Sequence, residues 1–157
     1  MPTVNDVAQY ILAKQDVDAG DTISNMKLQK LVYYAQGFCL AMTGNPLFPE
    51  EIQAWEHGPV SQDLYHVYKA YGAGSIPPPE KPIEEISAGF SEEQLEVIDE
   101  VLDVYGQFSA WKLRNLTHEE PTWLDRHGKA DNTITKSAMK EYFTTRLLDD
   151  DEEDTHA

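Results

Sequence analysis

Residues 25–44 read NMKLQKLVYYAQGFCLAMTG, and this stretch decides the fold. Its apolar residues recur at steps of three, four and seven, which is the period of one helix face. The residues on that face are Leu28, Leu31, Val32, Ala35, Phe38, Cys39 and Met42. A second uncharged file, Tyr34, Gly37 and Ala41, runs beside it. Because a surface helix needs only one narrow apolar face, a stripe this wide predicts a central buried helix over about 25–43.

The ends of this helix carry recognisable signals. Ser24 or Asn25 can accept a free backbone N–H at its start, and Gly44 can end it in a left-handed conformation. Gly37 lies inside the helix, where glycine costs roughly 1 kcal/mol relative to alanine. We therefore expect another backbone to pass close to Gly37.

Length and composition indicate one soluble domain. A chain of 157 residues is long enough to bury a core without disulfides, and it contains a single cysteine, Cys39. Cys39 falls on the apolar stripe and is interpreted as a small core side chain in a reducing compartment. The sequence shows no signal peptide and no membrane span, so we expect a cytoplasmic protein.

The charge balance narrows the class of partner. The formal net charge is −16, from 28 acidic and 12 basic side chains. Nucleic-acid binders neutralise phosphates with clustered Lys and Arg, so we expect no nucleic-acid binding by this chain alone. An acidic surface favours a basic protein partner, although the same acidity also serves solubility alone.

The rest of the chain predicts a mainly α, single-domain helical bundle over residues 1–148, followed by an acidic disordered tail over 149–157. A small β element is expected at about 51–57 and 83–86, where Gly58-Pro59-Val60 ends the first strand. Further helices are expected at about 3–14, 61–71, 91–106, 109–117, 123–127 and 136–148. In the helix over 61–71, the residues expected to face inward are Leu64, Val67, Tyr68 and Tyr71.

Residues that could carry catalysis or hold a metal do not form a recognisable motif. The intervals from His57 to His66 and from His118 to His127 are each nine residues, unlike the close pairs of zinc sites. Cys39 lies on the most apolar face, whereas a reactive thiol needs an electropositive, partly open setting. The pair Glu119-Glu120 is interpreted as solvated acid. We expect no enzyme, no cofactor, no catalytic residue and no metal ligand.

Large residues gather instead at turns. Aromatic side chains there indicate either a second packing layer or a recognition surface, and Trp and Tyr dominate protein interfaces. Two lysines on the polar first turns of the central helix stand out in so acidic a chain. The partner-binding residues predicted in this way are Lys27, Lys30, Tyr33, Trp55, His57, Gly58, Pro59 and Tyr65.

Three segments resemble a known family. They read MKLQKLVYYAQG over residues 26–37, GNPLF over 44–48 and AWEHGPV over 54–60, with Tyr65 following. In this order and spacing they resemble the Panacea domain, also described as the antitoxin SocA-like, phage-associated domain. The segments SAWKL over 109–113 and residues 116–123 and 134–143 are similar to its C-terminal half.

The resemblance implies a mainly helical antitoxin that neutralises a cognate protein toxin by direct binding. It also implies an alternative, an adaptor that delivers the toxin to a cytoplasmic protease, so a protease or chaperone is a second possible partner. A small hydrolase or metal protein that uses Cys39 or the histidines is the third hypothesis. The identity of the toxin and the oligomeric state stay open.

Overall fold

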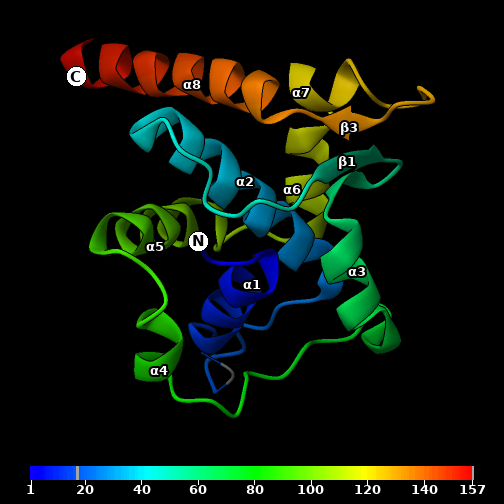
Figure 1. Ribbon diagram of the computed structural model, residues 1–157, viewed down its shortest axis with the longest axis vertical. Coiled ribbons are helices and arrows are strands. Elements are labelled where there is room, and N and C mark those ends of the chain that lie inside the picture. The colour runs from blue at the N-terminus through cyan, green and yellow to red at the C-terminus, as the bar shows by residue number, and fades with distance from the viewer. Residues whose placement is uncertain (17, 157) are drawn as a thin grey trace.

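In the computed structural model of the chain, one helix runs through the middle and the other elements surround it (Figure 1). The structure describes residues 1–16 and 18–156, and side chains are described up to residue 147. The elements are α1 Val4–Ala13, α2 Asn25–Thr43, β1 Ile52–Trp55, β2 Gly58–Val60, α3 Gln62–Tyr68, the 3-10 helix η1 Lys69–Tyr71, α4 Ile83–Ser87, α5 Glu92–Tyr105, α6 Ala110–Thr117, α7 Pro121–Leu124, β3 Thr133–Ile134 and α8 Lys136–His156. The mainly α fold class predicted from the sequence is confirmed.

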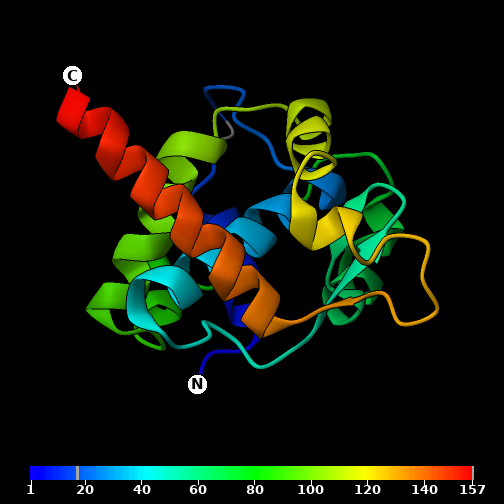
Figure 2. The same cartoon turned by 90° about the horizontal axis from the view of Figure 1, so that it is seen from above.

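Helix α2 is the central helix, as predicted. It contacts α1, α3, α5, α6, α8 and strand β2, and nearly all its residues up to Leu40 are buried. The Ser24 hydroxyl accepts the backbone N–H of Lys27, and Gly44 ends the helix with φ of 81°. Figure 2, seen from above, shows α8 lying across α2. The wide apolar stripe is therefore explained by neighbours on several sides.

The close neighbour of Gly37 is a side chain and not a backbone. A Cβ atom at Gly37 would lie 2.1 Å from the ring of Phe143, which comes from α8. The expectation of a close backbone is thus wrong, because an aromatic ring fills the space that a side chain at position 37 would need. Gly37 lets α8 pack onto α2 through this ring.

The small sheet differs from the predicted one. Its order is β2-β1-β3, with Gln53 opposite Val60 and Ile52 opposite Ile134 in antiparallel pairs. Gly58 has φ of 120°, so it reverses the chain after His57, and Gly58–Val60 forms a strand instead of ending one. The predicted strand at 83–86 is wrong, since Ile83–Ser87 is helix α4. The three-residue spacing of Ile83 and Ile86 suits one helix face equally well.

Two helix boundaries also differ. α3 ends at Tyr68 and continues as η1, so Val67 and Tyr71 are exposed and not inward as predicted. The short helix expected at 123–127 begins earlier, at Pro121, because proline suits the first turn of a helix. Side-chain hydrogen bonds cap the helix starts at Thr3, Ser91, Ser109 and Thr135.

The backbone of α8 continues to His156, beyond its predicted end at residue 148. The side chains of residues 148–157 lie outside the described part of the chain, and disorder of the acidic tail stays a prediction. Among the described residues, no helix has both the length and the apolar character needed to cross a bilayer.

Candidate functional site

A cavity of about 400 Å³ opens beside the first turns of α2. The β1–β2 hairpin, α3 and the start of α6 form its other walls. Four residues predicted to bind a partner line it together, namely Lys30, Trp55, His57 and Tyr65. Most of the remaining wall is apolar, with Met26, Val60, Ala73 and Ala110. The fold therefore brings the predicted residues of three separate segments to one place.

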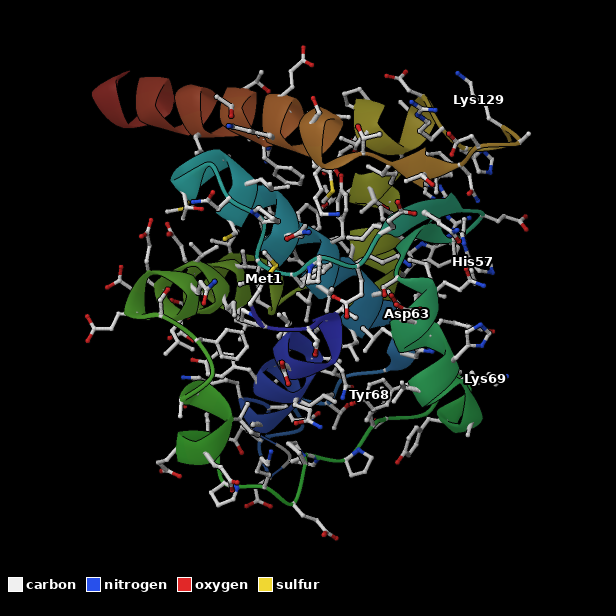
Figure 3. All side chains as sticks on the ribbon, in the orientation of Figure 1. Met1, His57, Asp63, Tyr68, Lys69 and Lys129 are labelled. Atoms are coloured by element: carbon white, nitrogen blue, oxygen red, sulfur yellow. The ribbon has the colours of Figure 1, made fainter. Side chains whose placement is uncertain are left out.

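One wall of this cavity is aromatic and partly open to solvent. The rings of Trp55 and Tyr65 meet edge to face with centroids 5.0 Å apart. The indole N–H of Trp55 donates to the side-chain oxygen of Gln53 at 2.8 Å, which fixes the ring on its strand. His57 is exposed at the hairpin turn, where Figure 3 labels it near α3. This wall offers apolar area at a low cost in side-chain entropy, as interface aromatics do.

Lys30 lies at the inner side of the cavity. Only 1% of its surface is exposed, and no hydrogen bond or ion pair to it is found among the described residues. Burial, and to a smaller extent the positive charge of Arg114, lowers the pKa of its ammonium to about 8. A cation in this setting is costly for the folded chain.

Gly58 lies against Lys30, and neither Gly58 nor Pro59 lines the cavity. Both are buried, and a Cβ atom at Gly58 would lie 2.8 Å from Cε of Lys30 and 2.9 Å from the hydroxyl oxygen of Thr117. Its φ of 120° also disfavours any other residue. The Gly58-Pro59 turn therefore shapes the space in which the lysine side chain lies.

Lys27 and Tyr33, which were also predicted to bind a partner, do not line the cavity and are not brought together with Lys30. Nζ of Lys27 donates to the carbonyl oxygen of Gly106 at 2.6 Å, and burial lowers its pKa. Tyr33 is completely buried. Each step of three residues falls about 60° short of a full turn, so Lys27 and Tyr33 are rotated about 120° from each other. Because α2 has neighbours on several sides, the two side chains meet different elements.

Tyr33 belongs to a buried polar cluster around Glu120. The hydroxyls of Tyr33 and Tyr34 donate to the two carboxylate oxygens of Glu120 at 2.7 and 2.8 Å. The hydroxyls of Tyr33 and Thr122 lie 2.6 Å apart. Burial raises the pKa of Glu120 to about 7, while the tyrosine hydrogen bonds and Arg146 oppose this rise.

The interpretation of Glu120 as solvated acid is therefore wrong. Two adjacent tyrosines on a buried stripe need an acceptor for their hydroxyls. This pair was the sequence signal that could have predicted a buried carboxylate. The cluster joins α2 to the residues just before α7.

A stack of three rings ties the C-terminal half to the hairpin. Trp123 lies between the rings of His118 and His127, with centroids 4.0 and 4.2 Å away. Its indole N–H donates to the carbonyl oxygen of Trp55 at 2.7 Å. Two of the five histidines, His118 and His127, thus pack on a tryptophan, whereas His57 and His66 are exposed.

Cys39 lies apart from this stack. It is 1% exposed, and burial raises the pKa of its thiol, so the site does not favour a thiolate. Among the described residues, no group of three or more His, Cys, Asp or Glu side chains could hold a metal ion.

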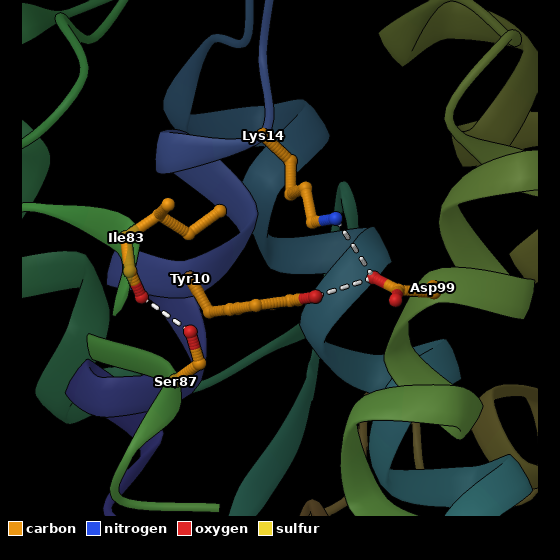
Figure 4. Close-up of polar contacts among 5 residues, drawn as sticks. All are labelled: Tyr10, Lys14, Ile83, Ser87 and Asp99. Carbon is orange, nitrogen blue, oxygen red and sulfur yellow. Dashed lines mark hydrogen bonds and ion pairs between the residues drawn. The ribbon is translucent and has the colours of Figure 1, made fainter. Parts of the chain in front are cut away.

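A larger hollow, of about 590 Å³, lies between α1 and α5. Two of its charged groups are paired with each other: Lys14 lies 3.6 Å from the carboxylate of Asp99, which also accepts the hydroxyl of Tyr10 at 2.6 Å (Figure 4). Burial and the neighbouring Asp99 raise the pKa of Tyr10. In the same view, the hydroxyl of Ser87 donates to the carbonyl oxygen of Ile83 within α4. None of the residues predicted to bind a partner lines this hollow.

Two comparisons with known proteins point to the same family. The family model for the antitoxin SocA-like, Panacea domain matches residues 28–124. The chain belongs to this family. Antitoxin SocA of Caulobacter vibrioides (strain NA1000 / CB15N) is 44% identical over 50 residues, which are 32% of this chain and 27% of that protein. No solved structure matches the chain.

The Panacea match covers most of the cavity. It extends from α2 to the end of α7 and includes Lys30, the hairpin and Tyr65. The resemblance read from the sequence is thereby confirmed, and membership supports an antitoxin role, which in general implies a toxin as partner.

Proposed function

We propose that this protein neutralises a protein toxin by direct binding, and that the toxin docks at the cavity lined by Lys30, Trp55, His57 and Tyr65. The observation that carries the proposal is the convergence of these residues, from three separate segments, on one open and mainly apolar cavity. Interfaces obtain most of their affinity from a few central aromatic and basic anchors, and this cavity offers both. Family membership supports the class of partner.

The net charge of −16 supports a partner that is basic overall. Opposite net charges speed encounter, and this steering weakens as salt increases. The cavity then supplies the short-range contacts that slow dissociation.

The first test expresses the adjacent reading frames of the source genome alone and together with this protein. We expect one of them to stop growth alone and to be rescued by co-expression, and its product to co-purify with this chain. Rescue without a complex of the two purified proteins would contradict direct binding. A shortened half-life of the toxin in cells would favour the adaptor hypothesis over simple masking.

The second test locates the contact. Tyr65→Ala should weaken the complex by more than tenfold, because it removes half of the aromatic wall. Val67→Ala is the matched control, since Val67 lies two residues further along α3 and is 55% exposed. Equal affinity of both variants for the toxin would exclude this cavity as the docking site.

A further inference from the structure

The feature that the proposed function leaves unexplained is the charge of Lys30. Its ammonium group is almost completely buried, and neither ion pair found among the described residues includes it. A buried charge without a partner is strongly unfavourable, whereas the same charge paired with an anion is tolerated. The cavity beside it is open to a ligand.

We infer that Lys30 binds one carboxylate of the partner protein, supplied by an Asp or Glu side chain that stands next to an apolar side chain. The carboxylate pairs with the ammonium, and the apolar neighbour packs against Trp55 and Tyr65. This inference rests on the proposed function and specifies the chemistry of the same site.

The surroundings of Lys30 add positive charge. Arg114 lies close enough to lower the pKa of Lys30. Burial, Arg114 and Lys30 together lower the pKa of His118, so this imidazole stays neutral and the added charge comes from Arg114. His57 lines the same cavity. Nε2 of His118 is buried and has no hydrogen-bond partner within the described part of the chain. In an otherwise acidic protein, this is a local site that favours an anion.

The donors available around the cavity suit a single carboxylate better than a phosphate. Both ends of the Gln29 amide are already used, since it donates to Asn25 at 3.2 Å and accepts the backbone N–H of Ser61 at 2.9 Å. Most of the other walls are apolar. A phosphate collects several strong donors, and a nucleic acid needs many cations, so both fit this cavity poorly.

The acidic tail of this chain is a poor candidate for the same place. Helix α8 begins near β3 and runs away from the hairpin, as Figures 1 and 2 agree. The tail of a second copy would bring another chain with a net charge of −16. The two chains would repel each other. A separate partner with a local carboxylate avoids this repulsion.

The experiment uses three pools of N-acetylated octapeptides on the immobilised full chain. The acidic pool has a central Asp or Glu next to Leu or Phe and an amidated C-terminus. The neutral pool replaces the acid by Asn or Gln, and the third pool is neutral but ends in a free carboxylate. We expect the wild-type protein to retain the acidic pool at least tenfold better than the other two.

Lys30→Met and Lys30→Gln should abolish this preference while the melting temperature stays the same or rises. Lys27→Met is the matched control, because Lys27 lies one turn earlier on α2 and donates to Gly106 outside the cavity. The control should keep the preference.

Retention should also decrease by about tenfold between pH 7 and pH 9, because Lys30, with a pKa of about 8, loses its proton there. The other titratable or charged groups around it are Arg114, His118 and His57.

Equal retention of the acidic and neutral pools, retention of the free-carboxylate pool alone, or no retention at all would overturn the inference. So would an acidic preference that survives in both Lys30 variants. Failure of the proposed function is a different result. If a toxin binds the wild type and Lys30→Met equally well, only the inference that Lys30 binds a carboxylate is wrong. If no toxin binds the wild type, the proposed function itself is wrong.

Discussion

Lys30 of the central helix and Glu120, which bonds to that helix, are both buried ionisable residues. Their surroundings differ, because one is paired and the other is not. Glu120 accepts hydrogen bonds from Tyr33 and Tyr34 and is enclosed by the core. Lys30 is buried more fully, at 1% exposed against 7% for Glu120, lines an open cavity and pairs with no acceptor among the described residues. The difference teaches that the carboxylate is a part of the fold, whereas the ammonium has no partner among the described residues and is, in our proposal, kept for a carboxylate of the partner protein.

The largest effect on stability is expected from Glu120→Ala. The change leaves two buried tyrosine hydroxyls without their acceptor and should lower the free energy of unfolding by about 3–5 kcal/mol. Urea unfolding followed by circular dichroism measures it. Glu119→Ala is the control, because Glu119 is exposed and should change stability by less than about 0.5 kcal/mol. A loss below 1 kcal/mol for Glu120→Ala would contradict the conclusion that the hydrogen bonds of Glu120 stabilise the fold.

The pH dependence of stability is a second test of Glu120. Because burial raises the pKa of Glu120 from 4.5 to about 7, the folded state keeps its proton in a range where the unfolded state has lost it. Stability from this group is fully present below pH 4.5 and decreases up to pH 7, by about 3 kcal/mol in total. Glu120→Gln should lack this decrease. Parallel pH profiles of the two proteins in urea unfolding would show that Glu120 is ionised throughout.

Lys30→Met tests the unpaired ammonium and should raise the free energy of unfolding. Burial lowers the pKa of Lys30 from 10.5 to about 8, so the cost of the buried charge is present in full below pH 8. The variant should gain about 1–3 kcal/mol at pH 7, and the gain should disappear as the pH rises towards 10.5.

Lys27→Met, measured in the same way, should instead lose about 1–3 kcal/mol, because its bond to the carbonyl oxygen of Gly106 is removed. If both lysine variants lost stability equally, Lys30 would have a partner within the fold.

The smallest effect is expected from Asp99→Asn on the polar hollow between α1 and α5. The ion pair with Lys14 is 3.6 Å long, and both side chains are about 40% exposed. Exposed pairs contribute little, and Asn can still accept the hydroxyl of Tyr10. Urea unfolding should show a loss under about 1 kcal/mol. A loss above 2 kcal/mol would mean that exposed pairs in this protein are as important as the buried Glu120 cluster.

Helix positions could be predicted to within a few residues because their signals are local. The wide stripe of α2, the capping box at Ser91 and the cap at Ser109 each depend on neighbours within four residues in the sequence. The segment Ile83–Ser87 could not be assigned from its sequence, because two isoleucines three apart fit a strand or a helix turn. The partner of β1 was missed for a related reason, since Thr133–Ile134 is too short to show any period.

Four of the residues named from the sequence line the cavity, but its geometry could not be predicted. Trp55, His57 and Tyr65 stand out as large residues near turns, and Lys30 as a cation in an acidic chain. Nothing in the sequence separates Lys30 from Lys27, or shows that Tyr33 turns towards Glu120, which is 87 residues away.

The sequence by itself determined the central helix, the helical class, the acidic charge and the membership of the Panacea family. Each of these depends on residue type and on spacing along the chain. Only the tertiary structure decided which ionisable groups are paired and which lysine faces the cavity. The physical reason is that burial, pKa and hydrogen-bond satisfaction depend on atoms that are close in space and distant in sequence.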